Sequence, residues 1–118
     1  MKSILITGGA GFIGQNLVKY FQSKHNIIII DNLSTKGTLK NFLFNRANVT
    51  FLKIDISNFS KIKESLKDIK IDYVIHAAAH FANENSIINP TKDLKTNILG
   101  TLNILELCKQ KKVKKFLY

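Results

Sequence analysis

The fold of this chain is decided by one stretch near its start, Thr7-Gly8-Gly9-Ala10-Gly11-Phe12-Ile13-Gly14. The apolar run 3–6 before it is typical of a short buried strand. Apolar residues then recur at helical spacing over 17–21, and a second apolar run, 27–30, ends on Asp31. We therefore expect a strand, a glycine turn, a helix, a second strand and an acid in this order. In that context a glycine motif indicates a dinucleotide-binding site.

Each position of the motif has a physical reason. Gly8 can adopt the backbone torsions of a tight turn directly after the strand. Gly11 lacks a Cβ, so a pyrophosphate can approach the first N–H groups of the helix, where the helix dipole favours an anion. Gly14 allows the helix to pack closely on the sheet. Asp31 is expected beside the adenosine ribose, where its charge opposes a 2′-phosphate, so the sequence predicts NAD rather than NADP.

The composition predicts one compact domain over residues 1–118. The chain is 45% hydrophobic but has no long apolar stretch, so we expect a protein that does not span or bind a membrane. The N-terminal apolar run is too short for a signal peptide. Cys108 is the only cysteine and cannot form an internal disulfide, which favours a reducing cytoplasm.

The net charge of +10 raises the possibility of a nucleic-acid partner. However, the lysines are spread over every expected helix, and no nucleic-acid-binding module is recognisable. The densest run, 109–115, falls where a long helix should end, and cations there interact well with the helix dipole. We interpret it as a solvated helix end in preference to a phosphate-binding patch, and we predict no nucleic-acid partner.

The rest of the chain continues the alternation of strand and helix. We expect strands at 49–55, 73–75 and 115–118, helices at 57–69 and 90–111, a short helical turn at 38–44, and loops at 32–37 and 80–89. This pattern predicts an α/β fold with a Rossmann-type doubly wound parallel sheet in the strand order 3-2-1-4-5. Because the chain stops at the fifth strand, before any helix that would cover it, we expect a truncated domain.

His76 and His80 are the only candidates for a metal pair. Their spacing of four residues crosses the end of an expected strand rather than a helix, and no third ligand is obvious. We therefore predict no metal site.

Six segments together resemble the extended short-chain dehydrogenase/reductase family, and within it the NAD-dependent nucleotide-sugar epimerases and dehydratases of the UDP-glucose 4-epimerase type. They are Thr7 to Gly14, Asp31-Asn32-Leu33-Ser34, Asp55-Ile56, His76-Ala77-Ala78-Ala79, Ser86 with Pro90, and Asn97 with Gly100-Thr101. The resemblance covers the whole chain but only about the first third of a typical family member. It implies NAD as cofactor and a UDP- or dTDP-linked sugar as substrate.

The resemblance also implies the roles of individual residues. The pyrophosphate turn would be lined by Gly8, Gly11, Phe12 and Ile13; the adenosine ribose by Asp31, Asn32 and Ser34; adenine by Asp55 and Ile56; and the nicotinamide ribose by Ala77, Ala78 and Ala79, with Asn97 bracing that loop. The alanines also fit simple close packing of a strand end, and Asn97 also fits a core amide satisfied by backbone. His80 stands where relatives often carry glutamine, which leaves the sugar undetermined.

No catalytic residue is expected within these 118 residues. The family uses a serine or threonine with a Tyr-x-x-x-Lys pair that lies well beyond the fifth strand. The local match Tyr20-Phe21-Gln22-Ser23-Lys24 falls on the first helix and is a decoy. The resemblance thus predicts the NAD-binding part of an isomerase or lyase that works by transient hydride transfer, inactive as this chain alone. A non-catalytic dinucleotide sensor and a basic nucleic-acid-binding protein are the alternatives.

The helix 90–111 is apolar around most of its circumference. One stripe, formed by Leu94, Ile98, Leu102 and Leu105, is expected to face the sheet, whereas Leu99, Ile104, Leu107 and Cys108 widen the apolar surface beyond it. In the resembled family this helix forms part of a dimer interface, which implies a homodimer through 90–111. Uncovered, such a surface predicts a marginally stable chain that self-associates.

Overall fold

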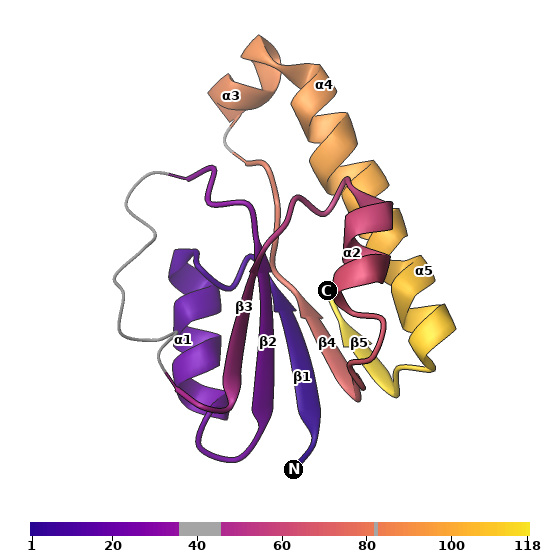
Figure 1. Ribbon diagram of the computed structural model, residues 1–118. Coiled ribbons are helices and arrows are strands. Elements are labelled where there is room, and N and C mark those ends of the chain that lie inside the picture. The colour runs from indigo at the N-terminus through magenta and orange to yellow at the C-terminus, as the bar shows by residue number, and fades with distance from the viewer. Residues whose placement is uncertain (36–45, 82) are drawn as a thin grey trace.

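The computed structural model describes residues 1–35, 46–81 and 83–118 (Figure 1). The helical turn expected at 38–44 lies outside the described residues. The elements are β1 (Ser3–Thr7), α1 (Phe12–Phe21), β2 (Asn26–Asp31), β3 (Val49–Lys53), α2 (Phe59–Ser65), β4 (Tyr73–His76), α3 (Asn83–Ile88), α4 (Pro90–Asp93), the π-helix η1 (Leu94–Gly100), α5 (Thr101–Lys111) and β5 (Lys115–Leu117).

The strands form one parallel sheet in the order β3-β2-β1-β4-β5, which confirms the predicted topology. β2 has the sequence Asn-Ile-Ile-Ile-Ile-Asp, with apolar side chains on both faces, as is usual where helices cover both sides of a sheet. Ile27 and Ile29 pack with Val18 of α1, whereas Ile28 and Ile30 pack with α2 and α5. Figure 1 shows this division, with α1 on one face of the sheet and α2 and α5 on the other.

α1 approaches the turn after β1 very closely, and glycines make this possible. Gly8 has a φ of +67°, and a Cβ on it would lie 2.8 Å from the backbone of Ala78 at the end of β4. A Cβ on Gly14 would lie 2.1 Å from the carbonyl oxygen of Gly8. Only glycine at both positions allows the helix, the turn and the end of β4 to meet.

Asn58 is the N-cap of α2: its side-chain oxygen accepts a hydrogen bond from the Lys61 N–H. The other end of this helix is held by Lys111 of α5. Its Nζ donates to the carbonyl oxygens of Leu66, Lys67 and Ile69 at 2.6, 2.7 and 3.1 Å. A lysine from the run 109–115 therefore closes the C-terminal end of a neighbouring helix.

A second lysine of that run belongs to an ion-pair cluster at the N-terminal ends of the strands. Lys114 Nζ lies 3.3 Å from a carboxylate oxygen of the buried Asp72, and Lys2 Nζ lies 4.0 Å from the same oxygen. The other oxygen of Asp72 accepts the Ser3 N–H at 3.0 Å. Hydrogen bonding from Ser3 and then from Lys114 holds the pKa of Asp72 below its usual range. The run is thus more than a solvated helix end.

The expected orientation of the long helix is wrong. Leu94, Ile98, Leu102 and Leu105 are exposed, by 55%, 63%, 60% and 45%, while the sheet is covered by Asn103, Ile104, Leu107 and Cys108. Two polar side chains on this inner face form hydrogen bonds as well. Thr101 hydrogen-bonds to His76, and Asn103 Nδ2 donates to the Ile56 carbonyl oxygen at 2.8 Å.

One further local expectation is also wrong. The segment predicted as a loop contains α3, whose side chains include the exposed Ile87 and Ile88. The helix predicted over 90–111 is present with these bounds, as α4, η1 and α5 in succession, and its part η1 is π-helical. π-Helical turns inside an α-helix are often found at functional sites, because they turn side chains away from the regular α-helical positions.

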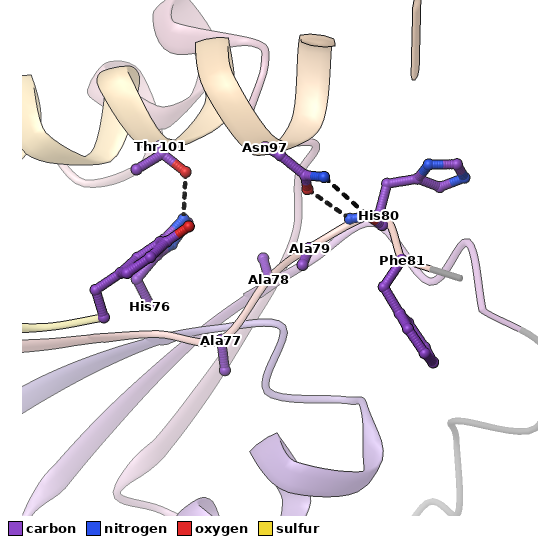
Figure 2. Close-up of a pocket in the computed structure, with 9 residues that line it drawn as sticks. His76, Ala77, Ala78, Ala79, His80, Phe81, Asn97 and Thr101 are labelled. Carbon is purple, nitrogen blue, oxygen red and sulfur yellow. Dashed lines mark hydrogen bonds between the residues drawn. The ribbon is translucent and has the colours of Figure 1, made fainter. Parts of the chain in front are cut away.

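His76 lies in a buried polar network that joins β1, β4 and α5 (Figure 2). Thr7 Oγ1 accepts the Ala78 N–H and is hydrogen-bonded to His76 Nδ1 at 2.7 Å. The other ring nitrogen of His76, Nε2, is hydrogen-bonded to Thr101 Oγ1 at 2.9 Å. Phe116 and Tyr118 pack beside the ring, and burial lowers the pKa of His76. A neutral imidazole is therefore part of the folded core.

The contact between Gly14 and Gly8 predicts a stability difference between two identical substitutions. Gly14→Ala should cost about 1–3 kcal/mol of unfolding free energy, because the new methyl overlaps a backbone oxygen that cannot move freely. Gly11→Ala is the control, since a Cβ there would meet only Gly8 O, at 3.3 Å. Urea unfolding of both variants measures the difference, and equal losses would contradict the packing argument.

The buried neutral His76 predicts that stability falls in acid. Its pKa is lowered on folding, so the unfolded chain binds more protons below about pH 6.5, the ordinary histidine value. The stabilisation is complete above that pH and is lost as the pH falls towards the folded pKa, at no more than about 1.4 kcal/mol per pH unit for one proton. Urea unfolding at pH 7.5 and 5.5 measures the slope. The loss of unfolding free energy between these pH values should be smaller in His76→Gln and unchanged in His25→Gln. If it is also unchanged in His76→Gln, the pH dependence does not come from His76.

Candidate functional site

The candidate site is a cleft of about 1170 Å³ at the carboxyl ends of the strands. One wall is the glycine turn with the start of α1, and the other is formed by residues from α3, α4 and η1. It brings together all the residues predicted from the sequence except two: Gly8, Gly11, Phe12, Ile13, Asp31, Asn32, Ser34, Ile56, Ala77, Ala78 and Ala79. Asp55 is hydrogen-bonded to the lining residue Asn32, and Asn97 lines a smaller adjoining pocket of about 340 Å³.

The start of α1 faces this cleft with unsatisfied N–H groups. Gly11 is the N-cap residue, and no side chain caps the helix. Phe12 and Ile13 follow with exposed side chains and line the cleft. The first N–H groups of a helix lack partners within it and carry the positive end of the dipole. This wall is therefore suited to binding an anionic group such as a pyrophosphate.

Asp31 ties the glycine turn to the end of β2. Its Oδ2 accepts the Ala10 N–H at 3.0 Å, and its Oδ1 accepts the Leu33 N–H at 2.8 Å. The second bond supports Leu33 in a left-handed conformation with a φ of +59°. Each carboxylate oxygen keeps a second lone pair, so Asp31 remains able to accept hydrogen bonds from a ligand hydroxyl.

Asn32 connects this loop to the end of β3. Its Oδ1 accepts the Ser34 N–H, and its Nδ2 donates to Asp55 Oδ2, both at 3.0 Å. The other oxygen of Asp55 accepts from the N–H and the hydroxyl of Ser57. Partial burial acts to raise the pKa of Asp55, but the bonds from Ser57 and Asn32, with the charge of Lys92, lower it overall. Asp55 is thus a fixed, ionised acceptor.

The segment after β4 is held from both sides. Thr7 accepts the Ala77 N–H through its carbonyl and the Ala78 N–H through its hydroxyl. Asn97 Oδ1 accepts the His80 N–H, and Asn97 Nδ2 donates to the His80 carbonyl oxygen, both at 2.8 Å (Figure 2). The small alanines between these anchors leave the cleft open, and Asn97 is both satisfied by backbone and a brace for this loop.

The sequence analysis missed a polar cluster around His80. His80 Nδ1 is paired with Asp93 Oδ1, and hydrogen bonds from Ser86 and His80 lower the pKa of Asp93. Thr96 and Lys92 also line the cleft. A signal was present in the spacing: Asp93, Asn97 and Thr101 recur every four residues, which makes one polar stripe on a helix.

Other candidates lie apart from this arrangement. Tyr20 of the local Tyr-x-x-x-Lys match is exposed on α1 and is not among the residues that line the cleft. Across residues 1–35, 46–81 and 83–118, no three His, Cys, Asp or Glu side chains gather in a way that would hold a metal ion. Over the same residues, no helix is both long enough and apolar enough to cross a membrane.

Comparison with known proteins identifies the family. Residues 4–118 match the family model described as the NAD dependent epimerase/dehydratase family. The chain is 39% identical to dTDP-D-glucose 4,6-dehydratase of Dictyostelium discoideum, over 100% of this chain and 28% of that protein.

Two solved structures are also similar over nearly the whole chain. UDP-glucose 4-epimerase of Thermus thermophilus in complex with NAD is 29% identical, with a TM-score of 0.82 over 97% of this chain and 36% of that one. UDP-glucose 4-epimerase of Thermotoga maritima with UDP-glucose is 34% identical, with a TM-score of 0.83 over 97% and 36%. The chain spans 28% to 39% of the length of three curated relatives that it matches. It belongs to the NAD-dependent epimerase/dehydratase family.

Proposed function

We propose that the cleft binds NAD, and that the protein acts as a nucleotide-sugar 4-epimerase or 4,6-dehydratase. One observation carries this proposal: the uncapped start of α1 and the Asp31 carboxylate are joined through the Ala10 N–H into a single wall. That wall offers N–H donors to a pyrophosphate and an acceptor to ribose hydroxyls, the two polar parts that every dinucleotide presents. The family match and the NAD complex of a similar epimerase support it.

Each part of the dinucleotide is assigned to its own group of residues. Pyrophosphate binds at Gly8, Gly11, Phe12 and Ile13; the adenosine ribose at Asp31, Asn32 and Ser34; adenine at Asp55 and Ile56; and the nicotinamide ribose at Ala77, Ala78 and Ala79, which Asn97 holds in place. Bound NAD supplies a hydride acceptor that later returns the hydride. The residues of this chain orient the cofactor and hold its ends apart along the sheet edge.

The proposed substrate is a UDP- or dTDP-linked sugar, because similar proteins carry both kinds of name. We further propose a cytoplasmic protein, because the buried Cys108 thiol, whose pKa burial raises to about 11, suits a reducing compartment. Finally, we propose that the exposed outer face of the long helix, formed by Leu94, Ile98, Leu102 and Leu105, is the contact of a homodimer.

The Asp31 carboxylate predicts a cofactor preference. The protein should bind NAD at least about tenfold more tightly than NADP, which corresponds to about 1.4 kcal/mol of repulsion against the 2′-phosphate. Asp31→Asn should reduce this preference, and calorimetric titration measures it. Asp55→Asn is the control with the same charge change; it should weaken NAD and NADP alike. Equal or tighter NADP binding by the unmodified protein would remove the argument from Asp31.

The exposed outer face of the long helix predicts self-association. Ile98→Lys with Leu102→Lys should shift the protein to monomer in light scattering while leaving the circular dichroism spectrum of the folded protein unchanged, since both side chains are exposed in the single chain. Tyr20→Lys, which charges an exposed apolar site on α1, should leave the association unchanged. A clean monomer of the unmodified protein at high concentration would exclude this interface.

A further inference from the structure

Lys92 occupies a position in the cleft that the proposed roles do not explain. It lies in the first turn of α4, where its backbone N–H is capped by Asn89, and its side chain lines the cleft on the wall opposite the glycine turn. A cation in the first turn of a helix interacts unfavourably with the helix dipole. The stability of α4 therefore gives no reason for a lysine here.

Nor does an ion pair account for Lys92. Among residues 1–35, 46–81 and 83–118, no carboxylate oxygen lies within 4.0 Å of its Nζ. Its charge nevertheless acts on Asp55, which is bonded to the lining residue Asn32. Against the effect of partial burial, it joins Ser57 and Asn32 in lowering the pKa of that carboxylate. Lys92 lines the cleft, and Asp55 lies just outside the lining, bonded to the lining residue Asn32, so a donor and an acceptor lie near one another at the end of β3.

The helix that carries Lys92 is fixed relative to the strand ends. Asp93 pairs with the His80 side chain, Asn97 bonds to the His80 backbone in both directions, and Thr101 bonds to His76. These contacts follow one another along the side of the helix that meets the segment after β4. Lys92 is thereby held over the cleft by its neighbours, with a flexible side chain and no competing partner in the described part of the chain.

We propose that Lys92 is a cofactor-binding residue that reads the adenine ring together with Asp55. Adenine presents the N7 acceptor directly beside the 6-amino donor. Asp55 accepts from the 6-amino group and the Lys92 ammonium donates to N7, while the apolar side chains of Ile54 and Ile56 line the cleft between them. This proposal rests on the proposed function, because it assigns the adenine end of the same cleft.

The pairing sets the base specificity of the cleft. Guanine carries an oxygen acceptor in place of the 6-amino group. That oxygen would face the ionised Asp55 without a proton between them, whereas Lys92 would serve either base. Lys92 therefore adds affinity and Asp55 adds discrimination.

The test measures the binding of AMP, 7-deaza-AMP and adenosine to the protein and its Lys92→Met variant by calorimetry or ligand-observed NMR. Methionine keeps the apolar stem and removes the donor. Lys92→Met should weaken AMP and adenosine by the same factor, about three- to tenfold, as for one exposed charge-assisted hydrogen bond. The unmodified protein should bind 7-deaza-AMP more weakly than AMP by that factor, and Lys92→Met should bind both equally. Lys95→Met, from the same helix but outside the cleft lining, should match the unmodified protein.

The outcomes separate this proposal from the proposed function. If Lys92→Met still discriminates against 7-deaza-AMP, or binds AMP as tightly as the unmodified protein, Lys92 does not contact N7 and the proposal is overturned. It is also overturned if AMP weakens while adenosine does not, because Lys92 then serves a phosphate. If the unmodified protein binds neither NAD nor AMP, it is the proposed function that fails.

Discussion

The site depends on one close contact, between Gly14 of α1 and the carbonyl oxygen of Gly8. A side chain at Gly14 would lie 2.1 Å from that oxygen, so the distance between helix and turn is set by the absence of a Cβ. The same turn is bound to β2 twice, through Gly8 N to the Ile30 carbonyl and Ala10 N to Asp31. Moving α1 outwards would therefore pull on the end of β2 as well as on the helix. The positions of the first N–H groups of α1 and of the Asp31 carboxylate therefore depend on the same turn.

The carboxyl ends of parallel strands pose a general difficulty, because each chain leaves the sheet there and its backbone loses ladder partners. In this protein, polar side chains replace those partners. Asp31 and Asn32 satisfy the loop after β2, Asp55 the turn after β3, and Thr7 and Asn97 the segment after β4. Binding then requires little further ordering of the backbone, which lowers the entropic cost of holding a long, flexible dinucleotide. The residues of the site thus stabilise the fold at the edge where the ligand would bind.

The spacing of apolar residues was enough to predict most elements, because each buried element shows the apolar pattern of a strand or a helix. The alternation of these elements along the chain then predicted the strand order of the sheet. These patterns failed where contacts between distant segments determine the local structure. α3 has no buried residue, so no apolar period marks it in the sequence. The rotation of the long helix was predicted from its longest apolar stripe, but the helix instead buries Ile104, Leu107 and Cys108, on the face from which Thr101 and Asn103 form hydrogen bonds. Similarly, most of the predicted cleft residues follow strands whose ends must converge, whereas Lys92 and His80 enter through contacts between distant segments.

The long helix divides into two halves with different tasks. From Thr101 to Lys111 its inner face is apolar apart from Thr101 and Asn103; this half covers the sheet and caps the end of α2 through Lys111. From Pro90 to Gly100 it has a single buried residue, Gly100, and its inner side chains bond to the segment after β4. The polar stripe of Asp93, Asn97 and Thr101 runs through both halves, and it bonds first to His80 and then to His76. The change from π-helix to α-helix at Gly100 falls where the contacts pass from the segment after β4 to the core, so one continuous helix packs against the core at one end and fixes the wall of the cleft at the other.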